Sequence, residues 1–177
     1  MPEKFCNEYN EIHLSPHFPW YFNSETISPD IKLNYKNNFN QKEIGQFTHM
    51  YYTDGKSNSE IFNVVSKILD VMTEKHNLKF SDIFRIKGNF LYNIKRDEKT
   101  IQPIHTDIVG SKNFISMIYY INDSDGDTYF FNKDNTLKKK ISPKRNRIIL
   151  FNSEIPHAGQ NPVENEYRII TNFVLKK

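Results

Sequence analysis

The residues best suited to chemistry in this sequence begin with a histidine and an aspartate two positions apart. His105 and Asp107 follow an apolar stretch and come just before Gly110. If the backbone is extended there, the two side chains point to the same side and could hold a metal ion together. Aspartate is also common in polar turns, so the pair alone leaves both interpretations open.

Two further residues near the end of the chain bear on this choice. His157 ends the run NRIILFNSEIPH, and Arg168 comes eleven residues later. Two histidines and one carboxylate can occupy one face of an octahedral Fe(II) and leave three neighbouring positions open. Arg168 offers a planar, permanently charged group that suits a carboxylate. Taken singly, His157 could be a rim histidine and Arg168 a surface ion-pair partner, but their common order and spacing favour an iron site.

A β framework must position these residues, and the sequence after residue 80 provides one. It contains a series of short β-rich runs, namely GNFLYNI, FISMIYYIN, DTYFFN, TLKKKIS, NRIILFN and EYRIITNFVL. Such a series indicates an antiparallel sandwich or barrel whose mouth can bind ligands. We expect a fold that is mainly β with N-terminal helices (α+β). It would form a single domain over 1–177, with residues 85–177 as the β core and 1–84 as a helical and aromatic cover on one face.

The first half of the sequence gives three more expectations. Apolar residues at helical spacing predict an amphipathic helix from Glu60 to about His76, capped by a residue of 57–59. The stretch QKEIGQF, residues 41–47, could form a shorter helix. The aromatic stretch 18–22 is expected to be buried, and it could instead border the mouth of the site together with the segment 94–103.

Composition limits the class of protein. The chain has 177 residues, 37% of them hydrophobic, which suits one globular domain. A formal charge of +3 permits an acidic partner without demanding one, and nucleic acid is not an expected partner. The single cysteine, Cys6, needs no oxidising compartment, and no stretch has the length of a signal peptide core or a membrane span. These features indicate a cytoplasmic protein with no membrane association.

The motifs together resemble a known family. The clip His105-x-Asp107 is followed by FISMIYYIND, GDTYFF, NRIILFNSEIPHAG and YRIITNF. This order is similar to the double-stranded β-helix (jelly-roll) core of the Fe(II)- and 2-oxoglutarate-dependent dioxygenases, in their prolyl 4-hydroxylase-like branch. The resemblance covers roughly residues 85 to 176.

The resemblance implies roles for the four residues introduced above. His105, Asp107 and His157 would bind Fe(II), and Arg168 would bind the distal carboxylate of the co-substrate 2-oxoglutarate. With O2, such an enzyme hydroxylates a C–H bond and releases succinate and CO2, and ascorbate would support turnover. The carboxylate ligand Asp107 favours hydroxylation, or dealkylation through hydroxylation, over halogenation, which needs a small residue at that position.

The resemblance also implies lining residues. Ser116, Ile118 and Tyr120 share one face of a strand and would line the interior, with Tyr120 hydrogen-bonded to the same carboxylate and Tyr119 facing away. Tyr92 resembles a family tyrosine that reaches the co-substrate or substrate, and it could equally be a core aromatic. Ile170 departs from the Ser or Thr of many relatives, and Asp127 stands where they often have glycine.

For the substrate, the resemblance implies first a prolyl residue in a peptide or protein. A free amino acid or other small metabolite is the next alternative, followed by a nucleic-acid dealkylase. A non-catalytic cupin-like binding module is the alternative from another class of protein, but such a module has no reason to keep three ligands and the arginine.

Overall fold

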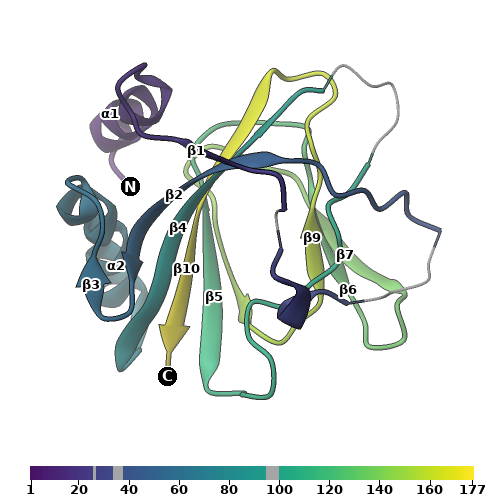
Figure 1. The fold of residues 1–177 in the computed structure, drawn as a ribbon. Coiled ribbons are helices and arrows are strands. Elements are labelled where there is room, and N and C mark those ends of the chain that lie inside the picture. Colours follow the sequence, from purple (N-terminus) through teal and green to yellow (C-terminus); the bar gives the residue numbers. More distant parts are fainter. Residues whose placement is uncertain (26, 34–37, 95–99) are drawn as a thin grey trace.

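A computed structural model describes residues 1–25, 27–33, 38–94 and 100–177, and two antiparallel sheets form its centre (Figure 1). The larger sheet has the strand order β1-β2-β4-β10-β5-β8, with β3 beside β2, and the smaller has the order β7-β6-β9. The strands of the larger sheet are β1 (Tyr21–Asn23), β2 (Gln46–Thr53), β3 (Lys56–Ser57), β4 (Asp82–Tyr92), β5 (Phe114–Tyr120), β8 (Ile148–Asn152) and β10 (Tyr167–Lys176). Those of the smaller are β6 (Thr128–Phe131), β7 (Leu137–Ile141) and β9 (His157–Gly159).

This is the expected double-stranded β-helix fold, although the strands do not close into a continuous barrel. The smaller sheet faces the larger one, and isolated bridges tie the segment before β5 to β9 and the residue after it. Ile101 bridges to Gln160 and His105 bridges to His157. This segment therefore runs along β9 of the smaller sheet and brings His105 beside His157.

The central strand β10 shows how the sequence separates core from site. Successive side chains of a strand point to opposite faces. One set packs into the main hydrophobic cluster with the helices, and it includes Ile169, Phe173 and Leu175. The alternate set lines an internal cavity, and it consists of Arg168, Ile170 and Asn172. The strand is thus buried on both faces, with apolar side chains on one and polar chemistry on the other.

Two helices cover the outer face of the larger sheet (Figure 1). Helix α2 (Phe62–His76) confirms the predicted amphipathic helix and buries Val65, Ile68, Leu69 and Met72. The predicted cap is wrong, since Ile61 occupies the N-cap position and no side chain caps the helix. Helix α1 (Glu3–Leu14), which the sequence reading did not anticipate, buries Cys6, Tyr9 and His13, and a short 3-10 helix spans Pro29–Ile31.

The first half of the chain contains more β structure than predicted. Residues 41–47 form no helix, because Gln46 and Phe47 begin β2 and pair with β1 and β4. In this segment, backbone pairing with the neighbouring strands outweighs a weak helical propensity. The aromatic stretch 18–22 is also only partly buried, since Tyr21 and Phe22 are 64% and 58% exposed. None of the described helices is long and apolar enough to cross a membrane.

Candidate metal centre and co-substrate pocket

His105 and His157 lie side by side because their backbones pair. Each backbone N–H donates to the carbonyl of the other, at 3.0 and 2.9 Å, and the ring centroids are 4.4 Å apart. The Nδ1 atom of His105 lies 3.1 Å from the carbonyl oxygen of Pro103, and that of His157 lies 2.9 Å from the carbonyl oxygen of Ile155. Carbonyls only accept, so both Nδ1 atoms carry the proton and both Nε2 atoms keep a free lone pair.

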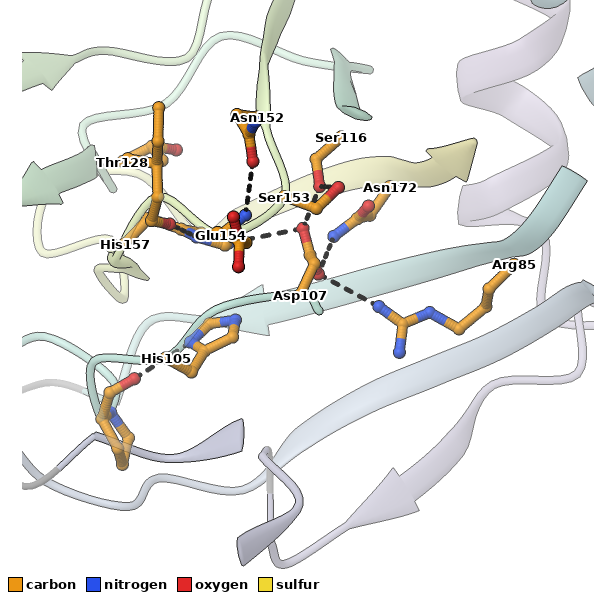
Figure 2. Close-up of polar contacts among 12 residues, drawn as sticks. Arg85, His105, Asp107, Ser116, Thr128, Asn152, Ser153, Glu154, His157 and Asn172 are labelled. Carbon is orange, nitrogen blue, oxygen red and sulfur yellow. Dashed lines mark hydrogen bonds and ion pairs between the residues drawn. The ribbon is translucent and has the colours of Figure 1, made fainter. Parts of the chain in front are cut away.

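Asp107 is buried and held by a set of donors (Figure 2). Its Oδ1 accepts from Nη2 of Arg85 at 3.1 Å and from Nδ2 of Asn172 at 3.2 Å. Its Oδ2 accepts from the Ser116 hydroxyl at 2.6 Å and lies 3.7 Å from Nε2 of His157. The carboxylate is therefore oriented with one oxygen toward the imidazoles.

The ionisation of this cluster suits a cation. Burial lowers the pKa of His105 below its ordinary value, and the neighbouring His157 lowers it further, so the ring stays neutral. Burial alone would raise the pKa of Asp107. The nearby His157 and the Arg85 guanidinium outweigh that effect and hold the pKa below its usual range. A neutral imidazole and an ionised carboxylate are the forms that bind a metal.

The three residues offer one ligand atom each, and these atoms lie within 4.8 Å of one another. Two nitrogens and one oxygen with open neighbouring positions form the 2-His-1-carboxylate arrangement typical of Fe(II) oxygenases. The backbone carbonyls behind both imidazoles and the donors behind the carboxylate are the supporting shell that such ligands need. These residues could hold Fe(II), and their donor set fits that ion.

Arg168 occupies another part of the same cavity and is only 3% exposed. Its Nη2 donates to the Thr128 hydroxyl at 2.8 Å, and that hydroxyl lies 2.7 Å from the hydroxyl of Tyr120. Its Nε has no hydrogen-bond partner, and the guanidinium forms no ion pair with any described residue. A buried cation in this state has the capacity to bind a carboxylate.

The backbone of two glycines makes room for this guanidinium. A Cβ on Gly126 would lie 2.9 Å from Cδ of Arg168 and 2.6 Å from the backbone oxygen of Gln160. A Cβ on Gly159 would lie 3.4 Å from Nη1 of Arg168. The glycine of GDTYFF therefore has a packing role beside Arg168.

The cavity has a volume of about 220 Å³. Its lining combines the three candidate ligands and Arg168 with side chains of β4, β5, β6 and β10, among them Arg85, Lys87, Asn89, Ile118, Thr128, Ile170 and Asn172. It is smaller than the roughly 300 Å³ at which pockets for drug-sized ligands begin. The space suits small molecules or one inserted side chain.

The structure places the predicted lining residues at different depths. Ile118 lines the cavity, whereas Ser116 lies behind Asp107 as its hydrogen-bond donor. Tyr120 is buried next to Thr128, which accepts a hydrogen bond from Arg168, and Cζ of Arg168 lies 5.8 Å from the centroid of the Tyr120 ring. Tyr119 faces away, as expected, with its ring 5.8 Å from that of Tyr9.

Other expected neighbours of the site lie elsewhere. The ring of Tyr92 lies 5.9 Å from that of Phe47, and Tyr92 is not among the residues lining the cavity. Phe18 and Tyr21 of the aromatic stretch border a separate surface hollow with β2 and the start of α2. Within 94–103, residues 95–99 lie outside the described part of the chain. The buried carboxylate of Asp127 forms an ion pair with Lys140 at 2.8 Å, so this residue has a role beyond its place in a turn.

Several polar residues of the cavity were not predicted from the sequence, namely Arg85, Lys87, Asn89, Thr128 and Asn172. The first three belong to β4, which begins at Asp82, whereas the predicted strand began at Gly88. The alternation of polar residues in RIKGN would have indicated a polar inward face. The same alternation from Arg168 would have found Asn172, two residues beyond Ile170.

Comparison with known proteins agrees with this geometry. Residues 90–175 match the model of the 2OG-Fe(II) oxygenase superfamily. The matched segment contains His105, Asp107, His157 and Arg168. This segment is that of a 2OG-Fe(II) oxygenase, a member of a superfamily of 2-oxoglutarate-dependent enzymes. The family implies Fe(II), 2-oxoglutarate and O2 as the reactants of its chemistry. A search of curated protein sequences finds no match.

Solved structures of 2OG-Fe(II) oxygenases share the fold, and prolyl hydroxylases are among them. A prolyl-4-hydroxylase from Pseudomonas putida is 14% identical, with a TM-score of 0.60 over 100% of this chain and 89% of that one. A prolyl hydroxylase from Trichoplax adhaerens, solved with a peptide fragment of hypoxia inducible factor, is 15% identical, with a TM-score of 0.62 over 99% and 80%. A 2OG-Fe(II) oxygenase from Burkholderia pseudomallei is 9% identical, with a TM-score of 0.65 over 99% and 79%.

Proposed function

We propose that this protein is a hydroxylase in which His105, Asp107 and His157 bind Fe(II) and Arg168 binds the distal carboxylate of 2-oxoglutarate. The observation that carries the proposal is found within one small cavity. A convergent set of two histidines and one carboxylate lies there with a buried guanidinium that has no carboxylate partner among the described residues. The co-substrate needs both, because it is a dianion that must be bound at a metal and at its far end.

The bound iron would couple the decarboxylation of 2-oxoglutarate by O2 to the insertion of one oxygen atom into a C–H bond, with the second oxygen atom going into succinate. The chain's own residues orient the reactants. The Thr128 hydroxyl accepts a hydrogen bond from Nη2 of Arg168 and is itself hydrogen-bonded to the Tyr120 hydroxyl. Burial raises the pKa of Tyr120, so its hydroxyl stays neutral. Ile118 and Ile170 add apolar walls that limit the space for water.

The proposed substrate is a prolyl residue in a peptide or protein, with a free amino acid or other small metabolite as the second candidate. The fold's likeness to prolyl hydroxylases, one of them solved with a peptide fragment, supports the prolyl ring. The polar lining contributed by β4 supports the free amino acid as the second candidate. Ascorbate would support turnover by keeping the iron reduced.

The direct test is succinate formation by protein loaded with Fe(II), 2-oxoglutarate and ascorbate in air, with mass spectrometry of products from proline-containing peptides and free amino acids. We expect succinate and a product heavier by one oxygen atom. His157→Ala should abolish both, and Ser66→Ala, on the exposed side of α2, should change neither. A binding module would form no succinate with any substrate, and that result would refute the proposal.

A further inference from the structure

The inward face of β4 carries a row of polar side chains that the binding of iron and 2-oxoglutarate does not explain. Arg85, Lys87 and Asn89 alternate along the strand and all line the cavity. In the register with β10, Lys87 is opposite Asn172 and Leu91 is opposite Arg168. The row therefore runs from the Arg168 end of the cavity toward Asp107, which Asn172 contacts.

Of the three cations that line the cavity in the described part of the chain, Lys87 is the one with neither a described anionic partner nor a role in binding the proposed co-substrate. Arg85 is paired with Asp107, and under the proposed function Arg168 binds the co-substrate. Lys87 is half-buried and forms no hydrogen bond or ion pair with any residue in the described part of the chain. Burial lowers its pKa to about 8, and the charge of Arg85 contributes, so the ammonium is still mainly protonated at neutral pH.

Lys87 lies far from the site of the distal carboxylate. Along β10, its partner Asn172 is four residues from Arg168, which corresponds to roughly 13 Å of strand. Lys87 is opposite Asn172, and Asn172 donates to Asp107, so the ammonium belongs to the end of the cavity near the proposed iron. One small co-substrate held at Arg168 has no need of Lys87 for its far carboxylate.

The charges of the lining point the same way. Among the described lining residues, Arg85, Lys87 and Arg168 face the single carboxylate of Asp107. Asp107 is paired with Arg85 and the proposed co-substrate with Arg168, so a carboxylate group that reaches Lys87 would meet an ammonium with no competing anion.

Two amide groups stand beside Lys87. The Oδ1 atoms of Asn89 and Asn172 are buried, and neither has a hydrogen-bond partner among the described residues. For Asn172 the orientation is fixed, because its Nδ2 donates to Asp107 and leaves Oδ1 turned away from that carboxylate. Free acceptors next to a free ammonium match a ligand that carries both a carboxylate and N–H donors.

We propose that Lys87 binds the carboxylate of the primary substrate, and that Asn89 and Asn172 accept hydrogen bonds from its amino group. The substrate is then a free α-amino acid rather than an internal residue of a peptide. This inference rests on the proposed oxygenase function and selects between its two candidate substrates. The C–H bond that is hydroxylated belongs to the side chain, which the Lys87 contact directs toward the metal ligands.

The test compares the binding of free amino acids with that of their carboxamides. It uses the anaerobic holoenzyme, loaded with Fe(II) and 2-oxoglutarate. Calorimetric titration would use the standard amino acids, their carboxamides, and the capped peptide acetyl-Gly-Pro-Gly-amide. At least one free acid should bind, and its amide should bind about 10- to 100-fold more weakly, since a charge-assisted contact is lost. Lys87→Met should weaken binding of the acid by a similar factor and leave binding of the amide unchanged. Lys87→Arg should retain most of the affinity for the acid.

Several outcomes would overturn the inference. These are the absence of binding by every free acid, equal binding of an acid and its amide, or binding of the capped peptide as tight as that of the best free acid. A separate titration would measure the binding of 2-oxoglutarate. If Lys87→Met weakened that binding instead, the residue would belong to the co-substrate site. The acid-to-amide comparison uses the unaltered protein, so it decides the matter even if the variant fails to fold. Failure of the oxygenase proposal itself would appear differently, as a protein that neither binds nor decarboxylates 2-oxoglutarate.

Discussion

At the scale of single residues, the site is built from ligands and from the groups that hold them. His105 and His157 are fixed by backbone carbonyls, and Asp107 is fixed by three side chains from β4, β5 and β10. Because each ligand already has its orientation, the arrangement needs little movement to accept an ion. The supporting groups should therefore matter almost as much as the ligands themselves.

Ser116 provides a test of this support. Its hydroxyl donates the shortest contact to Asp107, at 2.6 Å, and is itself fully buried. We expect Ser116→Ala to weaken metal binding about 10- to 100-fold, because the carboxylate loses a donor that orients it. Competition with a fluorescent chelator would measure the affinity. The exposed Ser66→Ala is the matched control, and an unchanged metal affinity in Ser116→Ala would contradict the assigned role.

Arg168 should separate co-substrate binding from metal binding. Arg168→Met keeps the length and apolar stem of the side chain but removes the charge. We expect the dissociation constant for 2-oxoglutarate to rise about 100-fold or more, since a buried charge pair is lost, while the metal affinity stays within a few-fold. Calorimetry on the metal-loaded protein gives the first quantity, and chelator competition gives the second. Equal loss of both would mean that Arg168 only supports the fold.

At the scale of elements, strands β2, β4, β5 and β10 of the larger sheet and β6 and β9 of the smaller sheet line the cavity. Strand β10 contributes Arg168 and Asn172, β4 contributes Arg85 and Lys87, and β9 begins with His157. The connection that contains Gly126 shapes the Arg168 end, because its backbone packs directly on that side chain.

Gly126→Ala tests this connection. The added methyl would meet the backbone oxygen of Gln160 at 2.6 Å and Cδ of Arg168 at 2.9 Å, so one of them must move. We expect the affinity for 2-oxoglutarate to fall about 10-fold or more and the protein to lose roughly 1–3 kcal/mol of stability, as for other overpacked sites. Calorimetry and urea unfolding measure the two effects. A variant with unchanged 2-oxoglutarate affinity would show that the guanidinium adapts freely.

The sequence predicted the second half of the fold well, for a physical reason. Most strands from residue 88 onward carry a strong β pattern, whereas the three-residue strand β9, which begins with His157, was not predicted. The first half could not be predicted in the same way. The segment 41–47 has a weak local preference, and its last two residues join β2 only because the edge of β4 offers unpaired backbone groups.

The polar lining was missed for a related reason. Lys87 and Arg85 look like solvated charges in the sequence, and their burial depends on sheet pairing with β2 and β10. Thr128 sits in a run that was correctly predicted as a strand, but its contact with Arg168 depends on how the two sheets face each other. Long-range pairing decides such contacts, and local pattern does not report it.

At the scale of the whole molecule, stability should depend on pH through a buried histidine remote from the metal centre. His13 of α1 is 1% exposed; its Nδ1 donates to the carbonyl of Tyr9, and its Nε2 accepts from the hydroxyl of Tyr51. Burial lowers its pKa from 6.5 to about 4. Between these two values the unfolded chain takes up a proton that the folded chain does not.

The free energy of unfolding should therefore fall as the pH drops from about 6.5 to about 4, by up to ~3 kcal/mol from this residue, and the loss from His13 should end below that range. Urea unfolding of the metal-free protein at a series of pH values measures the effect. Comparison with His13→Gln isolates it, since the variant should be less stable at pH 7 yet lose less stability on acidification. Parallel curves for the two proteins would exclude His13 as the source.

The reciprocal backbone bonds between His105 and His157 have a kinetic consequence. The two amides shield each other, so deuterium should enter them slowly even after a chelator has removed every ion. An exchange experiment on the stripped protein should find both positions protected to nearly the same degree as in the loaded form. Metal could then leave and return repeatedly without any refolding of the chain around it.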